Sequence, residues 1–307
     1  MTSYLLLPVI SPMPCSKMVK MRPCLKVTCL LLAYLFIFYL YSLEAHACTV
    51  WAAIGDKAGI KGVIVGKNRD NLPHLVTEVR FISPDHGNKI FGLFDVEADG
   101  YIVGGINNKG LVVFNASAVS VPKEKRHVAK EDFTERLLKS FDSVESALKD
   151  RDIFSKSHPA LYMLADPVMI AMVEIAPGGK IAVNKKENGY LAFTNHFIDS
   201  GLSKENKNNT LGSKERLRRI GIFLSRQNRP FTIDDFIAMS EDREGGPDCA
   251  IWRTGSSEEK VRTLAGFVFA VPSTGLPEVY IKLANPGEHE KIIRGKLDFM
   301  EMKILTP

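Results

Sequence analysis

The sequence contains few of the features that metal-dependent or nucleotide-dependent proteins require. Its seven histidines show no metal-ligand spacing. No glycine-rich loop followed by Lys-Ser or Lys-Thr is present to hold a phosphate group. Internal repeats, low-complexity tracts and a clear interdomain linker are also missing. These absences argue against metal and nucleotide chemistry, so we expect no metal ion and no cofactor.

The excess of positive charge is small and unevenly distributed. The formal net charge is +5, and residues 1–47 contribute three of these charges through four basic residues and one acidic residue. The remaining chain is therefore close to +2. An excess of this size gives no reason to expect a nucleic acid as a partner.

The first 47 residues have the layout of a secretory signal peptide. Four basic residues occur between Lys17 and Lys26, residues 27–43 are apolar and uncharged, and Ala45-His46-Ala47 follows. A basic stretch, an apolar stretch and a small-x-small triplet are typical of a removable export signal. Cleavage after Ala47 would leave residues 48–307 as one domain, exported to the periplasm or the medium.

Two other readings of this segment stay open. The apolar run of 17 residues is at the lower limit for spanning a membrane, so it can also be an uncleaved anchor. Alternatively, Cys48 is the lipidated residue of a lipoprotein. In either case the membrane would be reached only through this end of the chain.

Cysteine is scarce once the signal peptide is set aside. Of the five cysteines, only Cys48 and Cys249 lie beyond residue 47. A disulfide between them is one interpretation, because exported proteins often form such bonds. The other is that Cys48 is a reactive thiol and Cys249 a buried one.

Short apolar runs separated by Gly, Asn and Pro predict two groups of strands. The first group covers residues 49–53, 63–66, 76–83, 101–106 and 111–115, and the second covers 160–165, 170–175, 180–184 and 190–194. Helical spacing of apolar residues predicts helices over residues 133–141, 144–150, 213–225 and 232–240. Two further strands are expected over 263–271 and 278–284. The pattern predicts a single α+β domain of stacked sheets covered by helices.

Removal of residues 1–47 would give Cys48 both a thiol and a free α-amine. An α-amine can take the thiol proton near neutral pH without help from histidine. The amine also needs an acidic partner to hold it. Asp70 follows the second predicted strand and would return to Cys48 if the first two strands pair as a hairpin.

Several motifs resemble those of the N-terminal-nucleophile amide hydrolases. Cys48-Thr49 is followed by Gly66-Lys67-Asn68-Arg69-Asp70, as in the choloylglycine hydrolase, penicillin V acylase and isopenicillin N acyltransferase groups. Further matching segments follow in order: Gly105-Ile106-Asn107-Asn108-Lys109-Gly110-Leu111, Ala165-Asp166 with Val173-Glu174, Thr194-Asn195-His196-Phe197, and Ser213-x-x-Arg216-x-x-Arg219. The resemblance extends from Cys48 to about Pro286 and implies a four-layer αββα sandwich.

The resemblance also implies a role for each matching residue. Cys48 would attack an amide carbonyl, Asp70 would hold its amine, and Asn195 would donate to the oxyanion with Asn115 beside it. Arg216 would pair with Asp70 or with the thiolate. Beside these roles, we expect Lys67, at a position where the choloylglycine type has Arg, and Arg69 to bind substrate. Trp51 either lines an acyl pocket or packs in the core.

Three functions are compatible with these residues. The first is hydrolysis of a small linear amide to a carboxylic acid and an amine. The second is acyl transfer, which differs only in using an amine acceptor in place of water. The third is a membrane-anchored or lipidated binding protein that keeps the fold without a free amine at Cys48. A homo-oligomer is expected only by analogy with similar enzymes.

Overall fold

The computed structural model describes residues 47–96, 100–126, 132–208 and 210–306. The chain divides into two compact units after Leu43, and every described residue belongs to the second unit. The predicted signal peptide, apart from Ala47, lies outside the described residues, so its removal stays a prediction. Within the described ranges, no helix has the length and apolarity needed to cross a membrane.

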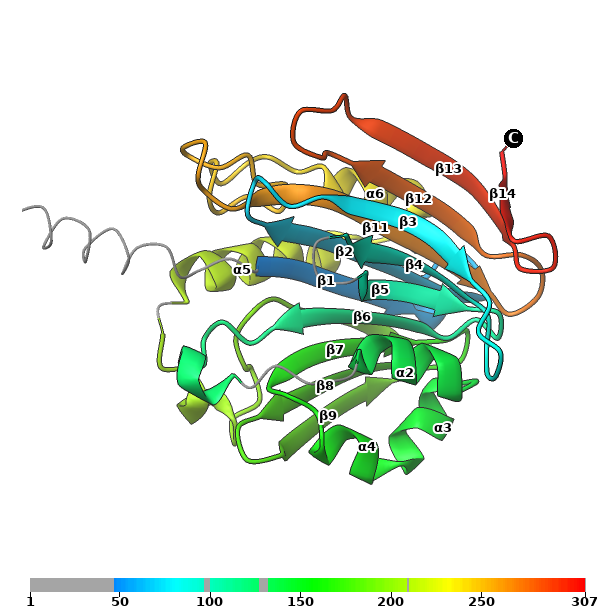
Figure 1. Cartoon of the computed structure of the whole chain (residues 1–307), viewed down its shortest axis with the longest axis horizontal. Coiled ribbons are helices and arrows are strands. Elements are labelled where there is room, and N and C mark those ends of the chain that lie inside the picture. The colour runs from blue at the N-terminus through cyan, green and yellow to red at the C-terminus, as the bar shows by residue number, and fades with distance from the viewer. Residues whose placement is uncertain (1–46, 97–99, 127–131, 209, 307) are drawn as a thin grey trace, which may run out of the picture. The chain divides into compact units, whose positions relative to one another are not determined.

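Two antiparallel seven-stranded sheets face each other (Figure 1). The first sheet has the order β10-β1-β2-β11-β12-β13-β14. Its strands are β1 (Ala47–Ile54), β2 (Gly62–Asn71), β10 (Gly189–Phe193), β11 (Arg262–Pro272), β12 (Glu278–Leu283), β13 (Lys291–Asp298) and β14 (Lys303–Leu305). It therefore joins strands from both ends of the described chain.

The second sheet follows the chain in simple order from β3 to β9. Its strands are β3 (Thr77–Ile82), β4 (Ile90–Asp95), β5 (Tyr101–Asn107), β6 (Val112–Ser117), β7 (Ala160–Ala165), β8 (Ile170–Ala176) and β9 (Lys180–Lys186). Each strand is hydrogen-bonded to the strand before it and the strand after it, so most contacts in this sheet are local in sequence.

Helices cover the outer face of each sheet. The helices α2 (Phe133–Ser140), α3 (Val144–Lys149) and α4 (Arg151–Ser155) pack on the second sheet, while α5 (Leu211–Arg226) and α6 (Ile233–Ser240) pack on the first. Three short 3-10 turns complete the described elements: Gly55–Lys57, Lys123–Lys125 and Ser203–Glu205. The order helix, sheet, sheet, helix confirms the predicted α+β sandwich.

Alternation along β1 assigns its side chains to two different layers. Cys48, Val50 and Ala52 point into the layer between the two sheets, which also contains an aromatic group from β4, β6 and β11. Trp51 and Ala53 point the other way, into the layer between the first sheet and helices α5 and α6. The candidate nucleophile therefore lies inside the sandwich.

The expected hairpin of the first two strands is confirmed, and several other expectations need correction. β1 pairs antiparallel with β2 over its whole length. However, β2 continues to Asn71 instead of ending near residue 66, because its polar side chains find buried partners. Strands β4, β13 and β14 were not expected, and the two predicted strand groups do not correspond to the two sheets.

Candidate active site

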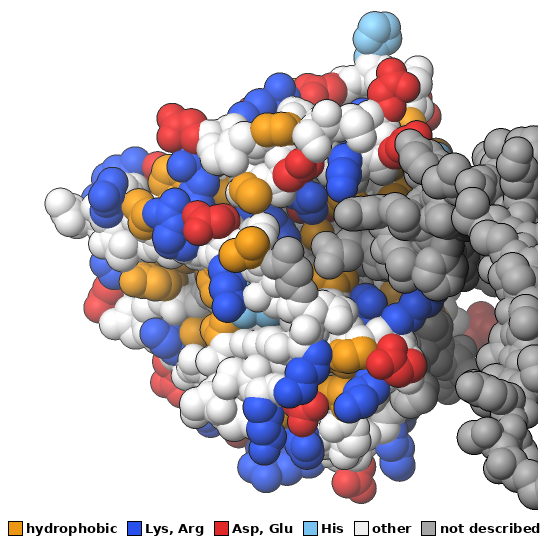
Figure 2. Space-filling model, turned by 90° about the vertical axis from the view of Figure 1, so that its left-hand side faces the viewer, with side chains coloured by type: hydrophobic (Ala, Val, Ile, Leu, Met, Phe, Trp, Pro, Cys, Tyr) orange, Lys and Arg blue, Asp and Glu red, His pale blue; other side chains and the backbone are white. Residues whose placement is uncertain are grey.

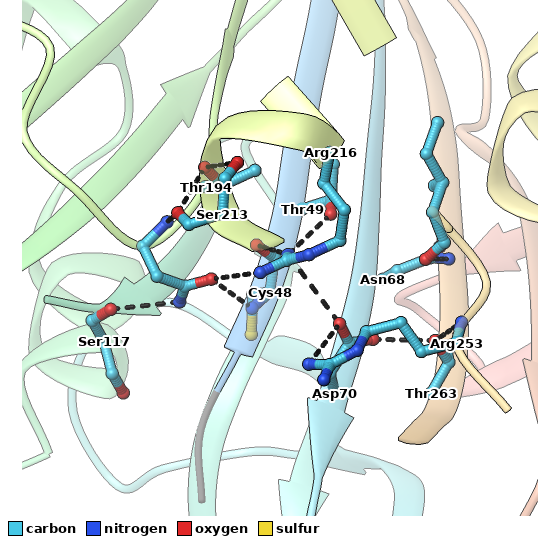
Figure 3. Close-up of polar contacts among 12 residues, drawn as sticks. Cys48, Thr49, Asn68, Asp70, Ser117, Thr194, Ser213, Arg216, Arg253 and Thr263 are labelled. Atoms are coloured by element: carbon cyan, nitrogen blue, oxygen red, sulfur yellow. Dashed lines mark hydrogen bonds and ion pairs between the residues drawn. The ribbon is translucent and has the colours of Figure 1, made fainter. Parts of the chain in front are cut away.

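Cys48 is the second residue of β1 and is buried, with 7% of its surface exposed. Its partners in the ladder place Arg69 of β2 directly opposite it and Asp70 opposite Ala47. Its main-chain nitrogen and carbonyl oxygen both point to side chains of other segments, as Figure 3 shows. The site is therefore assembled around the main chain of Cys48 as well as its thiol.

Asn195 contacts the nitrogen of Cys48. It follows β10 by two residues, and its Oδ1 accepts a hydrogen bond from the Cys48 N–H at 2.8 Å. Its Nδ2 donates to the carbonyl oxygen of Ser117 at 3.0 Å. Because an amide nitrogen carries two N–H groups, one donor remains for another acceptor. The sequence did not indicate Ser117, whose contribution is a main-chain carbonyl.

Arg216 lies in α5, the helix next to Asn195 and Cys48. Its guanidinium group donates to the Cys48 carbonyl oxygen at 2.7 Å and to Thr49 Oγ1 at 3.0 Å. A second terminal nitrogen donates to Asn195 Oδ1 at 3.1 Å. Only 2% of the residue is exposed, so these charge-assisted hydrogen bonds form away from water.

Asp70 lies behind Arg216 and is fully buried in the first sheet. One carboxylate oxygen accepts from Thr263 Oγ1 at 2.7 Å, and the other is 3.7 Å from both Arg216 and Arg253. Burial raises the pKa of Asp70, while the two guanidinium groups act to lower it. The structure thus connects Asp70 to Cys48 through Arg216 and adds Thr263 and Arg253, which the sequence motifs did not indicate.

The segment that carries Asn195 is fastened to the first turn of α5. The Ser213 hydroxyl accepts a hydrogen bond from the Asn195 N–H at 2.9 Å and lies 2.7 Å from His196 Nδ1. Burial lowers the pKa of His196 to about 4, with Lys214 and Arg216 adding to the effect. The imidazole is therefore neutral near pH 7, and its Nδ1 contacts Thr194 and Ser213 inside the protein.

Lys67 extends from β2 across the inner layer to the second sheet. Its Nζ donates to the main-chain oxygens of Val103 and Asn115, and to Asn115 Oδ1 at 3.0 Å. No part of the residue is exposed, and burial lowers its pKa to about 8. The three acceptors match the three N–H donors of an ammonium group.

Arg69 occupies the same face of β2, opposite Cys48. Its guanidinium group forms a buried ion pair with Asp95 of β4, and its other terminal nitrogen has no hydrogen-bond partner within the described ranges. Lys67 and Arg69 therefore both face the layer that contains Cys48. The sequence alone does not tell which of these two cations faces the site.

Two other predicted site residues, Trp51 and Asn115, use their side chains in contacts with helices. Trp51 is completely buried against Phe236 on the opposite face of β1, because successive side chains of a strand point to opposite faces. Asn115 donates from Nδ2 to Thr134 of α2 at 2.9 Å and accepts from Lys67 at Oδ1, and no hydrogen bond between described residues joins it to Asn195. The expectation of Trp51 in an acyl pocket is therefore corrected, and the role of Asn115 beside Asn195 stays a prediction.

Cys249 is a free, partly exposed thiol, so the expectation of a buried one is corrected as well. Cys48 is also free, and no bridge joins the two cysteines. Among the described residues no group of three or more His, Cys, Asp or Glu side chains is placed to hold a metal ion. A separate surface cavity lies between Lys125, His158 and Lys180, and none of its lining residues belongs to this site.

A conjugated bile acid hydrolase of known structure has a similar fold. A variant of the conjugated bile acid hydrolase from Clostridium perfringens has a TM-score of 0.51 at 14% sequence identity, covering 80% of this chain and 92% of that chain. Penicillin V acylase from Agrobacterium tumefaciens has a TM-score of 0.42 at 14% identity, covering 81% and 86%. Comparison with curated protein sequences finds no match.

A family match covers most of the chain and identifies its relationship. Residues 58–287 match the family described as acyl-coenzyme A:6-aminopenicillanic acid acyl-transferase. This match and the shared sandwich confirm the resemblance to the N-terminal-nucleophile linear amide hydrolase group. The chain therefore belongs to the acyl-coenzyme A:6-aminopenicillanic acid acyl-transferase family.

Proposed function

We propose that this protein is an exported hydrolase of linear amides whose nucleophile is Cys48, made the first residue by removal of residues 1–47. The observation that carries the proposal is the double contact of Asn195 and Arg216 with the main chain of Cys48. An ordinary strand residue needs no side chains on its nitrogen and carbonyl oxygen beyond the sheet itself. A terminal amine that works as a base needs such contacts to keep its position.

The proposed reaction uses the thiol and amine of the same residue. The amine takes the thiol proton while Cys48 Sγ attacks the amide carbonyl carbon, and the tetrahedral oxyanion accepts the free N–H of Asn195. The ammonium then returns the proton to the leaving amine, and the C–N bond breaks to give a thioester. Water, deprotonated by the same amine, cleaves the thioester and releases the carboxylic acid.

Asp70 is the proposed partner of the new amine. It lies directly opposite Ala47 in the ladder, and its Oδ2 has no hydrogen-bond partner among the described residues. Loss of Ala47 would leave a charged amine on Cys48 at the end of β1, beside the strand that carries Asp70. Burying a carboxylate is costly unless its charge is paired, so a cationic amine would add to the pairing that Arg216, Arg253 and Thr263 already give Asp70.

The partner we propose is a small amide. Basic, acidic and apolar side chains are interspersed on the visible face of Figure 2, which favours a small molecule over a nucleic acid. The second terminal nitrogen of Arg69 supports a role in binding a polar group of that substrate, because it is buried and unpartnered in the described structure. Lys67 would add positive charge to the same layer without contacting the substrate.

Acyl transfer is the second candidate, favoured by the description of the matched family. The two reactions share every step up to the thioester and differ in what attacks it. Incubating the enzyme with an N-acyl amide, with and without an added acceptor amine, separates them by product analysis. A new N-acyl product at the expense of free acid would favour transfer.

The proposal is tested first by the intact mass of the exported protein. A mass that begins at Cys48 with an unblocked nitrogen is expected, followed by turnover of at least one member of a panel of N-acyl amides of varied acyl length. A retained N-terminal segment or a lipid adduct would contradict the proposal and favour an anchored binding protein.

A further inference from the structure

Ser213 is the point at which helix α5 contacts the segment that carries Asn195. It is the third residue of the helix, and its side chain is buried. Its hydroxyl accepts the Asn195 N–H at 2.9 Å and lies 2.8 Å from Thr194 Oγ1 and 2.7 Å from His196 Nδ1. One hydroxyl thus contacts three consecutive residues.

Arg216 follows Ser213 by three positions, so both side chains lie on the same side of α5. Arg216 donates to the side-chain oxygen of Asn195, whereas Ser213 accepts from its main-chain nitrogen. The Thr194 hydroxyl adds a bond to the Ser213 carbonyl oxygen at 2.9 Å, as Figure 3 shows. The helix therefore holds Asn195 at its main chain and at its side chain.

We propose that Ser213 is a positioning residue for amide cleavage, which fixes the main chain of Asn195 so that its amide nitrogen faces the oxyanion formed at Cys48. This inference rests on the proposed function. A donor stabilises the oxyanion only when it is placed in advance where the charge develops. Displacement by about 1 Å is enough to lower a rate by about 10²-fold.

The main-chain N–H of Asn195 has Ser213 as its described hydrogen-bond acceptor. Asn195 has left the ladder of β10, so its N–H depends on the Ser213 hydroxyl instead of a neighbouring strand. Without that hydroxyl, a buried donor would be unsatisfied, and the segment would shift to find another acceptor. Ser213 has no described contact with the Cys48 side chain, so its loss should leave the reactivity of the thiol unchanged.

The experiment compares two reactions of the same thiol. All variants are made in the full chain with Cys249→Ser, so that Cys48 is the only thiol beyond residue 47. Ser213→Ala is expected to lower kcat for an N-acyl amide by about 10- to 100-fold with KM within about twofold. Alkylation of Cys48 by iodoacetamide should keep its rate, because substitution at an alkyl carbon forms no oxyanion.

Matched variants separate positioning from general damage. Ser213→Thr retains the hydroxyl and should recover most of kcat, and Ser225→Ala removes an exposed hydroxyl of the same helix and should change nothing. Thr194→Val perturbs the same cluster more weakly and should lower kcat several-fold, which keeps the test decisive if Ser213→Ala is too unstable to isolate.

Two results would overturn the inference. One is an unchanged kcat in Ser213→Ala, or in Thr194→Val where that variant replaces it. The other is a parallel fall of kcat and alkylation rate, which would indicate a disturbed thiol in place of a displaced donor. Complete alkylation of Cys48 in the wild type is tested before any variant. If hydrolysis is then intact, the proposed function itself is wrong.

Discussion

Strand β2 consists of two halves that are equally buried and opposite in character. Residues 62–66 are apolar, whereas residues 67–71 contain two cations, two amides and a carboxylate, and all ten are buried. The apolar half gains free energy simply by leaving water. The polar half can be buried only because each of its charged groups has a partner from a distant part of the chain.

The two halves of β2 contribute to different properties: the apolar half to the stability of the fold, and the polar half to the proposed reaction. Beside the apolar half, Phe269 of β11 packs on Phe91 and Phe114 of the second sheet. Beside the polar half lie Cys48 and the groups that contact it. Buried charge of this kind does not favour folding in itself. Its presence at this end of the inner layer is therefore best explained by the proposed reaction.

The largest effect is expected from Cys48→Ser, which changes one atom opposite the polar half. Turnover should fall by about 10³-fold or more, because an alcohol is a far poorer nucleophile than a thiol. The free energy of unfolding should change by less than about 2 kcal/mol. Hydrolysis of an active N-acyl amide and chemical denaturation measure the two quantities, and equal turnover of variant and wild type would exclude Cys48 as nucleophile.

Phe269→Ala should instead lower the stability of the protein and leave its turnover unchanged. Phe269 lies opposite Val65 in the apolar half. Phe269 stacks on Phe114 at 5.8 Å between ring centres, and its removal leaves a cavity in the inner layer. We expect a loss of about 3–5 kcal/mol in the free energy of unfolding. The kcat of the remaining folded protein should be unchanged, and a fall in kcat larger than the loss of folded protein would show that the two halves are coupled.

Lys67→Met tests how burial of a charged group in the polar half changes the free energy of unfolding as the pH is varied. Burial lowers the pKa of Lys67 from 10.5 in the unfolded chain to about 8 in the folded protein. Between these values the unfolded state binds more protons, so the stability of the wild type rises with pH.

From pH 8 to pH 10.5 the wild type should therefore gain about 3 kcal/mol relative to the Met variant. Denaturant unfolding of both proteins across this range measures the difference between them, in which the titration of other groups cancels. A constant difference would mean that Lys67 keeps an ordinary pKa in the folded protein.

The smallest effect is expected from Cys249→Ser, which lies outside both halves. Its thiol is free and partly exposed, and none of its described contacts involves Cys48. Activity should stay within about twofold of the wild type, because no part of the proposed reaction uses this thiol. Loss of activity under non-reducing conditions would instead indicate a bond between the two cysteines.

The predictable parts of the fold are those encoded by local pattern. Helix α6 is one example, since it lies within the predicted range of residues 232–240 and begins at a Thr232–Asp235 capping box. β13 was missed because Gly295 stands in its alternating pattern, so that only Ile293 and Leu297 mark the inward face with apolar side chains. The polar half of β2 was missed because its partners, such as Asp95 and Ser240, are 26 or more residues away.

The same limit applies to the site. Motifs in the sequence identify Cys48, Asp70, Asn195 and Arg216, which the structure brings together through Arg216. They do not identify the carbonyl of Ser117, because a main-chain group leaves no trace in residue type. Trp51 was misplaced because the sequence alone does not tell which face of β1 meets the second sheet.

Neighbouring strands are close in sequence in the second sheet and far apart in the first, and this difference determines when each sheet can form during synthesis. The second sheet is a run of neighbouring strands that can pair as they leave the ribosome. Strand β2 must wait for β11, so Asp70 lacks Thr263 until the last sixth of the polypeptide has begun to emerge. If the proposed reaction is correct, a nascent chain would therefore be inactive until translation is almost finished.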